Sequence, residues 1–145
     1  MTGLVLLCAA VCLTLLAGVA HRRRDGRLRE VHQTAGTAQE APALRSVLDQ
    51  LGELPGERVT LLQFSSAFCA PCRATRRTLS DVAAMVEGVA HVEVDAEQHL
   101  DLVRRFGIVK TPTTLVLDAG AVEVKRASGQ PRKADVLAAL GHALP

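Results

Sequence analysis

VTLLQFSSAFCAPC, residues 59–72, joins an apolar run to a CxxC pair of cysteines. Val59 to Phe64 is rich in β-branched and large apolar residues, which is typical of a buried strand. The residues that follow the pair have a helical pattern. Pro71 suits a first helical position, because its missing N–H would have no hydrogen-bond partner there. The order of strand, CxxC and helix predicts a redox site.

The two cysteines are expected to have different roles. Cys69 is placed where free backbone N–H groups and the positive end of the helix dipole converge, and these stabilise a thiolate. We therefore expect Cys69 to be the nucleophile and Cys72 to be the resolving thiol. The chemistry expected of the pair is thiol–disulfide exchange through a mixed disulfide.

Two other interpretations of the CxxC pair are weaker. A structural zinc site needs four ligands, but the other cysteines lie in an apolar N-terminal stretch and the histidines are scattered. We therefore expect no metal. A permanent structural disulfide at this spacing would close too small a loop to remove much chain entropy from the unfolded state.

The N-terminal segment predicts a membrane anchor. No side chain from Gly3 to Ala20 is charged, and as a helix this run would be about 27 Å long. Arg22, Arg23 and Arg24 follow it, and the positive-inside rule places them in the cytoplasm. The predicted organisation is a transmembrane helix over 1–21, a basic juxtamembrane segment and flexible linker over 22–42, and a folded domain over 43–145.

The position of the arginines bears on whether the N-terminal segment is a cleaved secretory signal. A cleaved secretory signal carries its positive charge before the apolar core, whereas here the arginines follow it. Cleavage of the segment and an outward-facing domain remain open, because Ala17-Gly18-Val19-Ala20 offers the small residues of a cleavage site.

The charge of the domain indicates no nucleic-acid partner. From residue 43 onward acidic and basic residues balance, and no basic stripe with interleaved aromatics occurs.

The remaining pattern predicts an α/β domain. Strands and helices alternate, which indicates a central mixed sheet covered on both faces by helices, with a hairpin at one edge. The expected elements are a helix over 44–51, a strand over 59–64, a helix after the CxxC, a strand over 89–94, a helix over 97–106, strands over 113–117 and 122–127, and a helix over 132–144.

Cys69-Ala70-Pro71-Cys72 and Lys110-Thr111-Pro112-Thr113 together make the chain resemble the thioredoxin family. The resemblance covers the chain from about Ala43 to the end, with the family's usual first strand missing or hidden in the linker. It implies a thioredoxin-like fold and a cis Pro112 that packs against the active-site sulfurs. It also implies that Thr111 and Pro112 bind the substrate chain.

Three further residues belong to the substrate groove by the same resemblance, namely Phe68, Ala70 and Pro71. Phe68 stands where the family commonly has Trp. Ala70-Pro71 replaces the usual Gly-Pro dipeptide. Both are tolerated variations of the motif.

A more consequential departure concerns the proton of the resolving thiol. Gln63 stands where thioredoxins usually carry a buried Asp that helps to move this proton, and an amide does no acid–base work. The lysine that often accompanies that Asp aligns with His91, which is either a proton relay or a satisfied edge histidine. Arg73, just after the CxxC, is expected to stabilise the Cys69 thiolate modestly.

These features predict a membrane-tethered protein-disulfide reductase on the cytoplasmic side. Its expected partners are disulfide-containing or dithiol proteins and a reductase-type electron donor, with no bound cofactor. One alternative is an envelope-facing reductant or oxidant of secreted or cytochrome-maturation proteins, which usually carries an insertion between the two motifs. The other is a weakly active binding module, against which the intact thiol pair argues.

Overall fold

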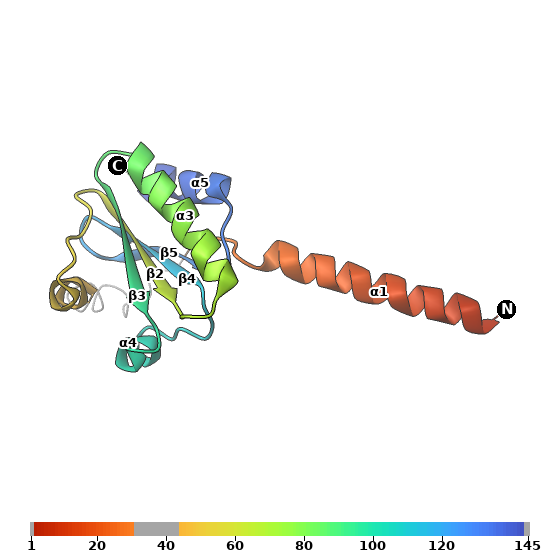
Figure 1. The fold of residues 1–145 in the computed structure, drawn as a ribbon. Coiled ribbons are helices and arrows are strands. Elements are labelled where there is room, and N and C mark those ends of the chain that lie inside the picture. Colours follow the sequence, from red (N-terminus) through yellow and green to blue (C-terminus); the bar gives the residue numbers. More distant parts are fainter. Residues whose placement is uncertain (1, 31–43, 144–145) are drawn as a thin grey trace.

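The computed structural model describes residues 2–30 and 44–143, and a five-stranded sheet lies at its centre (Figure 1). The strands are β1 (Arg29–Glu30), β2 (Val59–Ser65), β3 (Val89–Asp95), β4 (Thr113–Asp118) and β5 (Glu123–Ser128). Their order across the sheet is β1-β5-β4-β2-β3. β2 and β3 are parallel, whereas the β2–β4, β4–β5 and β1–β5 pairs are antiparallel. The predicted mixed sheet is confirmed.

Two helices, α3 (Ala70–Met85) and α5 (Lys133–Ala143), lie together against one face of the sheet (Figure 1). They share a buried cluster with the side chains of β2 and β4 that point toward them. Its members are Val59, Leu61, Leu79, Val82, Val116, Val136 and Leu140. The odd-numbered apolar residues of β2 therefore face α3 and α5, as the two-residue period of a strand requires.

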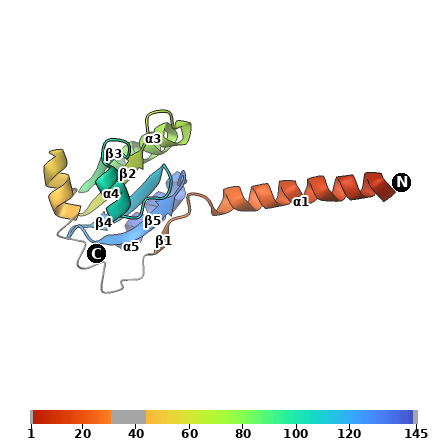
Figure 2. The ribbon, with the colours of Figure 1, turned by 90° about the horizontal axis from the view of Figure 1, so that it is seen from below.

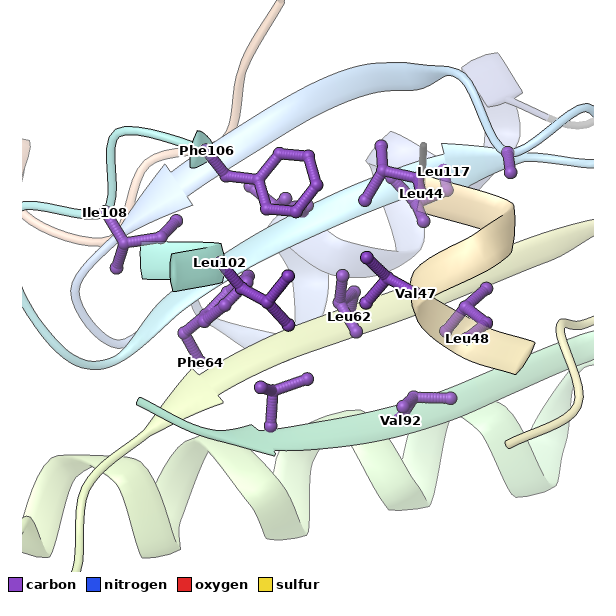
Figure 3. Close-up of a cluster of buried hydrophobic side chains, with 13 residues drawn as sticks. Leu44, Val47, Leu48, Leu62, Phe64, Val92, Leu102, Phe106, Ile108 and Leu117 are labelled. Atoms are coloured by element: carbon purple, nitrogen blue, oxygen red, sulfur yellow. The ribbon is translucent and has the colours of Figure 1, made fainter. Parts of the chain in front are cut away.

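The opposite face is covered by helix 44–51 and by α4 (Leu100–Arg105). Figure 3 shows Leu44, Val47 and Leu48 of helix 44–51 on the side of the sheet to which Leu62 of β2 points. Leu102 and Phe106 belong to the same cluster, in which the Phe64 and Phe106 ring centroids lie 6.3 Å apart. With both faces covered, all seven residues of β2 are buried.

The N-terminal helix α1 (Thr2–Arg24) stands clear of the domain (Figures 1 and 2). Its apolar side chains are exposed, for example Leu6 at 69% and Leu16 at 67%. Taken over the described residues alone, no helix has the length and apolarity needed to cross a membrane.

The short stretch after α1 returns to the sheet. The Gly26 N–H donates to the Ser128 carbonyl at 2.9 Å, and β1 pairs with β5 in the register Arg29–Arg126 and Glu30–Lys125. The sequence analysis assigned residues 22–42 to a basic juxtamembrane segment and flexible linker, with the family's first strand either missing or hidden there, and β1 lies within this range. Two polar residues carry no strand pattern, and only the open edge of β5 gives them a partner. Residues 31–42 of that segment, and residue 43 at the predicted start of the domain, lie outside the described residues.

Most element boundaries differ from the predicted ones by a residue or more, and local side-chain hydrogen bonds account for the starts of α4 and β5. α4 begins at Leu100 rather than near residue 97, because the Asp95 carboxylate accepts from the Glu97 N–H and closes a turn. β5 begins at Glu123 because Asp118 Oδ1 accepts from the Val122 N–H in the hairpin turn.

We predict that Leu79→Ala lowers the free energy of unfolding by about 2–5 kcal/mol, since Leu79 is fully buried and its removal leaves a cavity. The matched control on the same helix is Met85→Ala, whose side chain is 62% exposed and whose loss should cost no more than about 0.5 kcal/mol. Guanidinium denaturation followed by circular dichroism measures both, as the chain lacks Trp and Tyr. Equal losses in the two variants would contradict the burial of Leu79.

Candidate active site

The two cysteines of the CxxC form a disulfide at the N-terminus of α3. Cys69 is the N-cap residue, and its sulfur accepts from the Cys72 N–H at 3.1 Å, while Pro71 lies in the first turn. Cys69 is partly exposed, whereas Cys72 is 1% exposed. A substrate disulfide can therefore reach Cys69 and not Cys72. This difference in access supports the predicted roles of nucleophile and resolving thiol.

The second motif lies beside the disulfide. The Thr111–Pro112 peptide bond is cis, as the resemblance implied. The Thr111 hydroxyl is 3.0 Å from the Ser66 hydroxyl, which links this loop to the segment before the CxxC. Pro112 is buried at the start of β4, and its carbonyl accepts from the Gly129 N–H at 2.7 Å.

Between the two motifs lies a cavity of about 630 Å³, large enough for an extended peptide segment. Its wall includes Pro71, Thr111 and Pro112, together with Lys110, Gly129 and residues 130–133. Asp25 also lines it and forms an ion pair with Lys110. Phe68 is 99% exposed next to Cys69 and is free to contact a substrate, although it does not line this cavity. The roles of these residues in substrate binding stay predictions.

Behind Cys72, the fully buried Gln63 is the centre of a hydrogen-bond network. Its amide nitrogen donates to the Cys72 carbonyl at 3.0 Å and to the Ser65 hydroxyl at 2.7 Å. Its amide oxygen lies 3.1 Å from His91 Nε2. His91 Nδ1 in turn lies 3.1 Å from the Ser80 hydroxyl. The structure thus brings Gln63 and His91 together, as the family resemblance implied.

The partners of His91 define its hydrogen-bonding roles. The Gln63 oxygen only accepts, so Nε2 carries the proton, and in a neutral ring Nδ1 then accepts from Ser80. Burial lowers the pKa of His91, and the Arg76 charge lowers it further, while the Glu93 charge opposes both. The ring is therefore neutral near pH 7, and the edge histidine is hydrogen-bonded at both nitrogens.

One acidic residue of this region was missed by the sequence analysis. Glu93 lies on β3 opposite Gln63 of β2 and forms an ion pair with Arg76 at 2.5 Å. The sequence analysis singled out Arg73, which lines a second cavity that lies next to Cys72. The ion pair is formed instead by Arg76, one helical turn further along α3. The alternation of His91, Glu93 and Asp95 along the strand was the available signal. The effect of Arg73 on the thiolate stays a prediction.

Metal-ligating residues do not gather elsewhere in the part of the chain that the structure describes. Within residues 2–30 and 44–143, no three His, Cys, Asp or Glu side chains are grouped for a metal ion. Cys8 and Cys12 are free thiols exposed on α1, far along the chain from the redox pair.

An accessible sulfur paired with a buried one at a helix N-terminus, facing a cis-proline loop, defines a disulfide oxidoreductase. The family model described as Thioredoxin matches residues 48–142. The chain belongs to the thioredoxin family.

Relatives and solved structures agree with this assignment. The chain is 30% identical to the thioredoxin of Mycoplasma genitalium over 62% of this chain and 88% of the relative. It is 32% identical to the thioredoxin of Mycolicibacterium smegmatis over 63% and 83% of the two chains. The crystal structure of thioredoxin NaTrxh from Nicotiana alata shares the fold, with a TM-score of 0.57 and 21% identity over 72% of this chain and 87% of the other.

The lowered pKa of His91 predicts a pH dependence of stability. In the unfolded chain His91 has its ordinary pKa of 6.5, whereas in the folded protein this pKa is lowered and the ring binds a proton only at lower pH. The free energy of unfolding should therefore fall as the pH drops below about 6.5. Glu93 does not supply this slope, because its pKa is lowered from 4.5 and it stays ionised there.

His91→Gln should remove this part of the decline, because the amide does not titrate. Guanidinium midpoints of both proteins across the window from about pH 7.5 to 5 measure it. The same decline in the variant would show that His91 does not carry the effect.

Proposed function

We infer that this protein is a protein-disulfide reductase held at the membrane by α1, with its domain on the cytoplasmic side. The assignment as a reductase rests on one observation, the pairing of an accessible Cys69 with a buried Cys72 at the N-terminus of α3. The cavity beside the cis-proline loop supplies a place for the substrate chain.

The reaction follows from this difference in access. The Cys69 thiolate attacks a substrate disulfide, forms a mixed disulfide and releases one substrate thiolate. Cys72 then attacks the Cys69 sulfur, forms the disulfide present in the structure and releases the second substrate thiolate. Two electrons have passed to the substrate. A dithiol protein or a reductase-type donor must supply two electrons to restore the thiols.

Two features of α3 favour the Cys69 thiolate. The helix begins with backbone N–H groups that have no partner in the preceding turn, and the Cys72 N–H points at the Cys69 sulfur. No acidic residue occupies the first turn of α3, so nothing there opposes a negative charge. Free backbone N–H groups at a helix N-terminus are an environment that generally lowers the pKa of a cysteine thiol.

The membrane part of the proposal rests on α1 and its sequence. Apolar side chains cover the helix on all sides and are exposed to solvent, a surface that is costly to leave uncovered. The run from Gly3 to Ala20 carries no charge, and the arginines that follow fit anionic head groups of the cytoplasmic leaflet.

We predict that Cys69→Ser abolishes the reduction of insulin disulfides with dithiothreitol as the electron source, because the nucleophile is lost. Cys72→Ser should instead accumulate mixed disulfides, visible as adducts on non-reducing gels, since the resolving thiol is absent. The Cys8→Ser/Cys12→Ser double variant is the matched control and should keep full activity. Full activity of both Cys69→Ser and Cys72→Ser would overturn the mechanism.

Membrane attachment and sidedness are tested on the full chain carrying Cys8→Ser and Cys12→Ser. The protein should stay in the membrane pellet after alkaline carbonate extraction, because apolar burial is insensitive to ionic conditions. After mild reduction, a membrane-impermeant thiol reagent should label Cys69 only once the cells are lysed. Labelling of intact cells would show that the protein is an envelope-facing oxidoreductase. Release of the protein by carbonate would show that α1 is not a membrane anchor.

A further inference from the structure

The second step of the exchange proposed above has a requirement that Gln63 does not meet. Cys72 is a buried thiol and must lose its proton as it attacks the Cys69 sulfur. The Gln63 nitrogen already donates to the Cys72 carbonyl and to Ser65, and its oxygen accepts from His91. An amide has no proton-accepting capacity near neutral pH. The proton must leave by another route.

A cavity of about 330 Å³ opens next to Cys72 and offers that route. A water molecule takes about 30 Å³ of liquid volume, so several fit. The lining is polar and includes two carboxylates. It consists of Ser65, Ser66, Ala67, Cys72, Arg73, Arg76, Glu93 and Asp95.

The two carboxylates differ in the elements that hold them. Asp95 accepts from the Glu97 N–H and from the Gln98 amide, each at 2.9 Å, so both of its oxygens hold the turn before α4. Glu93 is held by Arg76 of α3, at 2.8 Å from Nη2 to Oε1 and 2.5 Å from Nε to Oε2, and it lines the same cavity from the position opposite Gln63 in the β2–β3 register. A carboxylate thus stands one strand away from the amide at position 63.

The groups around Glu93 keep it ionised. Burial raises its pKa, but hydrogen bonds from Arg76 and Ser65 and the Arg76 charge outweigh burial, and the pKa is lowered from 4.5. The facing charged and titratable groups are Arg73 and Arg76 from α3, and His91 and Asp95 from β3. The Ser65 hydroxyl accepts from Gln63 and therefore has its own proton to donate to Glu93.

We propose that Glu93 accepts, through water in this cavity, the proton that Cys72 loses when it resolves the mixed disulfide. The bond between Cys69 and the substrate sulfur breaks and the Cys69–Cys72 bond forms. The proton moves from the Cys72 thiol to the Glu93 carboxylate and then to the released substrate thiolate or to solvent. No electrons are gained or lost overall, because a thiol–disulfide exchange conserves them.

A single probe separates the two steps in the full chain carrying Cys8→Ser and Cys12→Ser. One equivalent of the disulfide DTNB reacts with reduced Cys69 and releases one thionitrobenzoate, and resolution by Cys72 then releases the second. Stopped-flow absorbance records both phases. In Glu93→Gln the second phase should slow about tenfold or more at pH 7, while the first phase is unchanged.

The pH profile is the readout that a merely structural role would not produce. The slowing should diminish as the pH rises, because hydroxide in the cavity water then takes the Cys72 proton without the carboxylate. Glu93→Asp keeps a carboxylate and should retain most of the rate at pH 7, and it carries the test should Glu93→Gln fail to fold. Glu97→Gln, an exposed change of the same charge, should behave as the parent.

Three results would overturn the proposal for Glu93. They are an unchanged second phase in Glu93→Gln, a slowing by the same factor at every pH, and an equal slowing of the first phase. A parent protein with no first phase would instead overturn the proposed reductase itself, so the two failures are distinguishable.

Discussion

Strand β2 is buried on both faces, and this burial positions both cysteines. Its alternating side chains pack against α3 and α5 on one side and against helix 44–51 and α4 on the other. Because the strand cannot shift without exposing one of these clusters, its last residue fixes where the chain turns into α3. Cys69 lies at that turn and is partly exposed, and Cys72 lies one helical turn deeper against the sheet.

The same burial makes polar residues in the core costly unless they are paired. Gln63 is fully buried, yet its amide is satisfied by Cys72, Ser65 and His91. This neutral network keeps the strand rigid beneath the disulfide without a buried charge. The ionised group is displaced to Glu93 on the neighbouring strand, where Arg76 and a solvent-accessible cavity stabilise it.

The segment after α1 is tied to the same end of the domain. Asp25 pairs with Lys110 next to the cis-proline loop, and Gly26 donates to Ser128 at the end of β5. Gly26 has a positive φ, and a Cβ there would lie 2.0 Å from the Gln130 carbonyl oxygen, so a glycine is required. The exposed helix α1 therefore joins the domain beside the cavity lined by Pro71, Thr111 and Pro112 rather than at a distance from it.

Local pattern was sufficient for the element types, the CxxC at a helix start and the two motifs, since apolar period and capping act within a few residues. It was not sufficient for β1, whose two polar residues form a strand only because β5 has an open edge. The local pattern also did not establish the hydrogen bond between Gln63 and His91, and it did not place Glu93 near Cys72. Strand register and helix packing bring these residues together across long sequence separations, and no single segment encodes such distances.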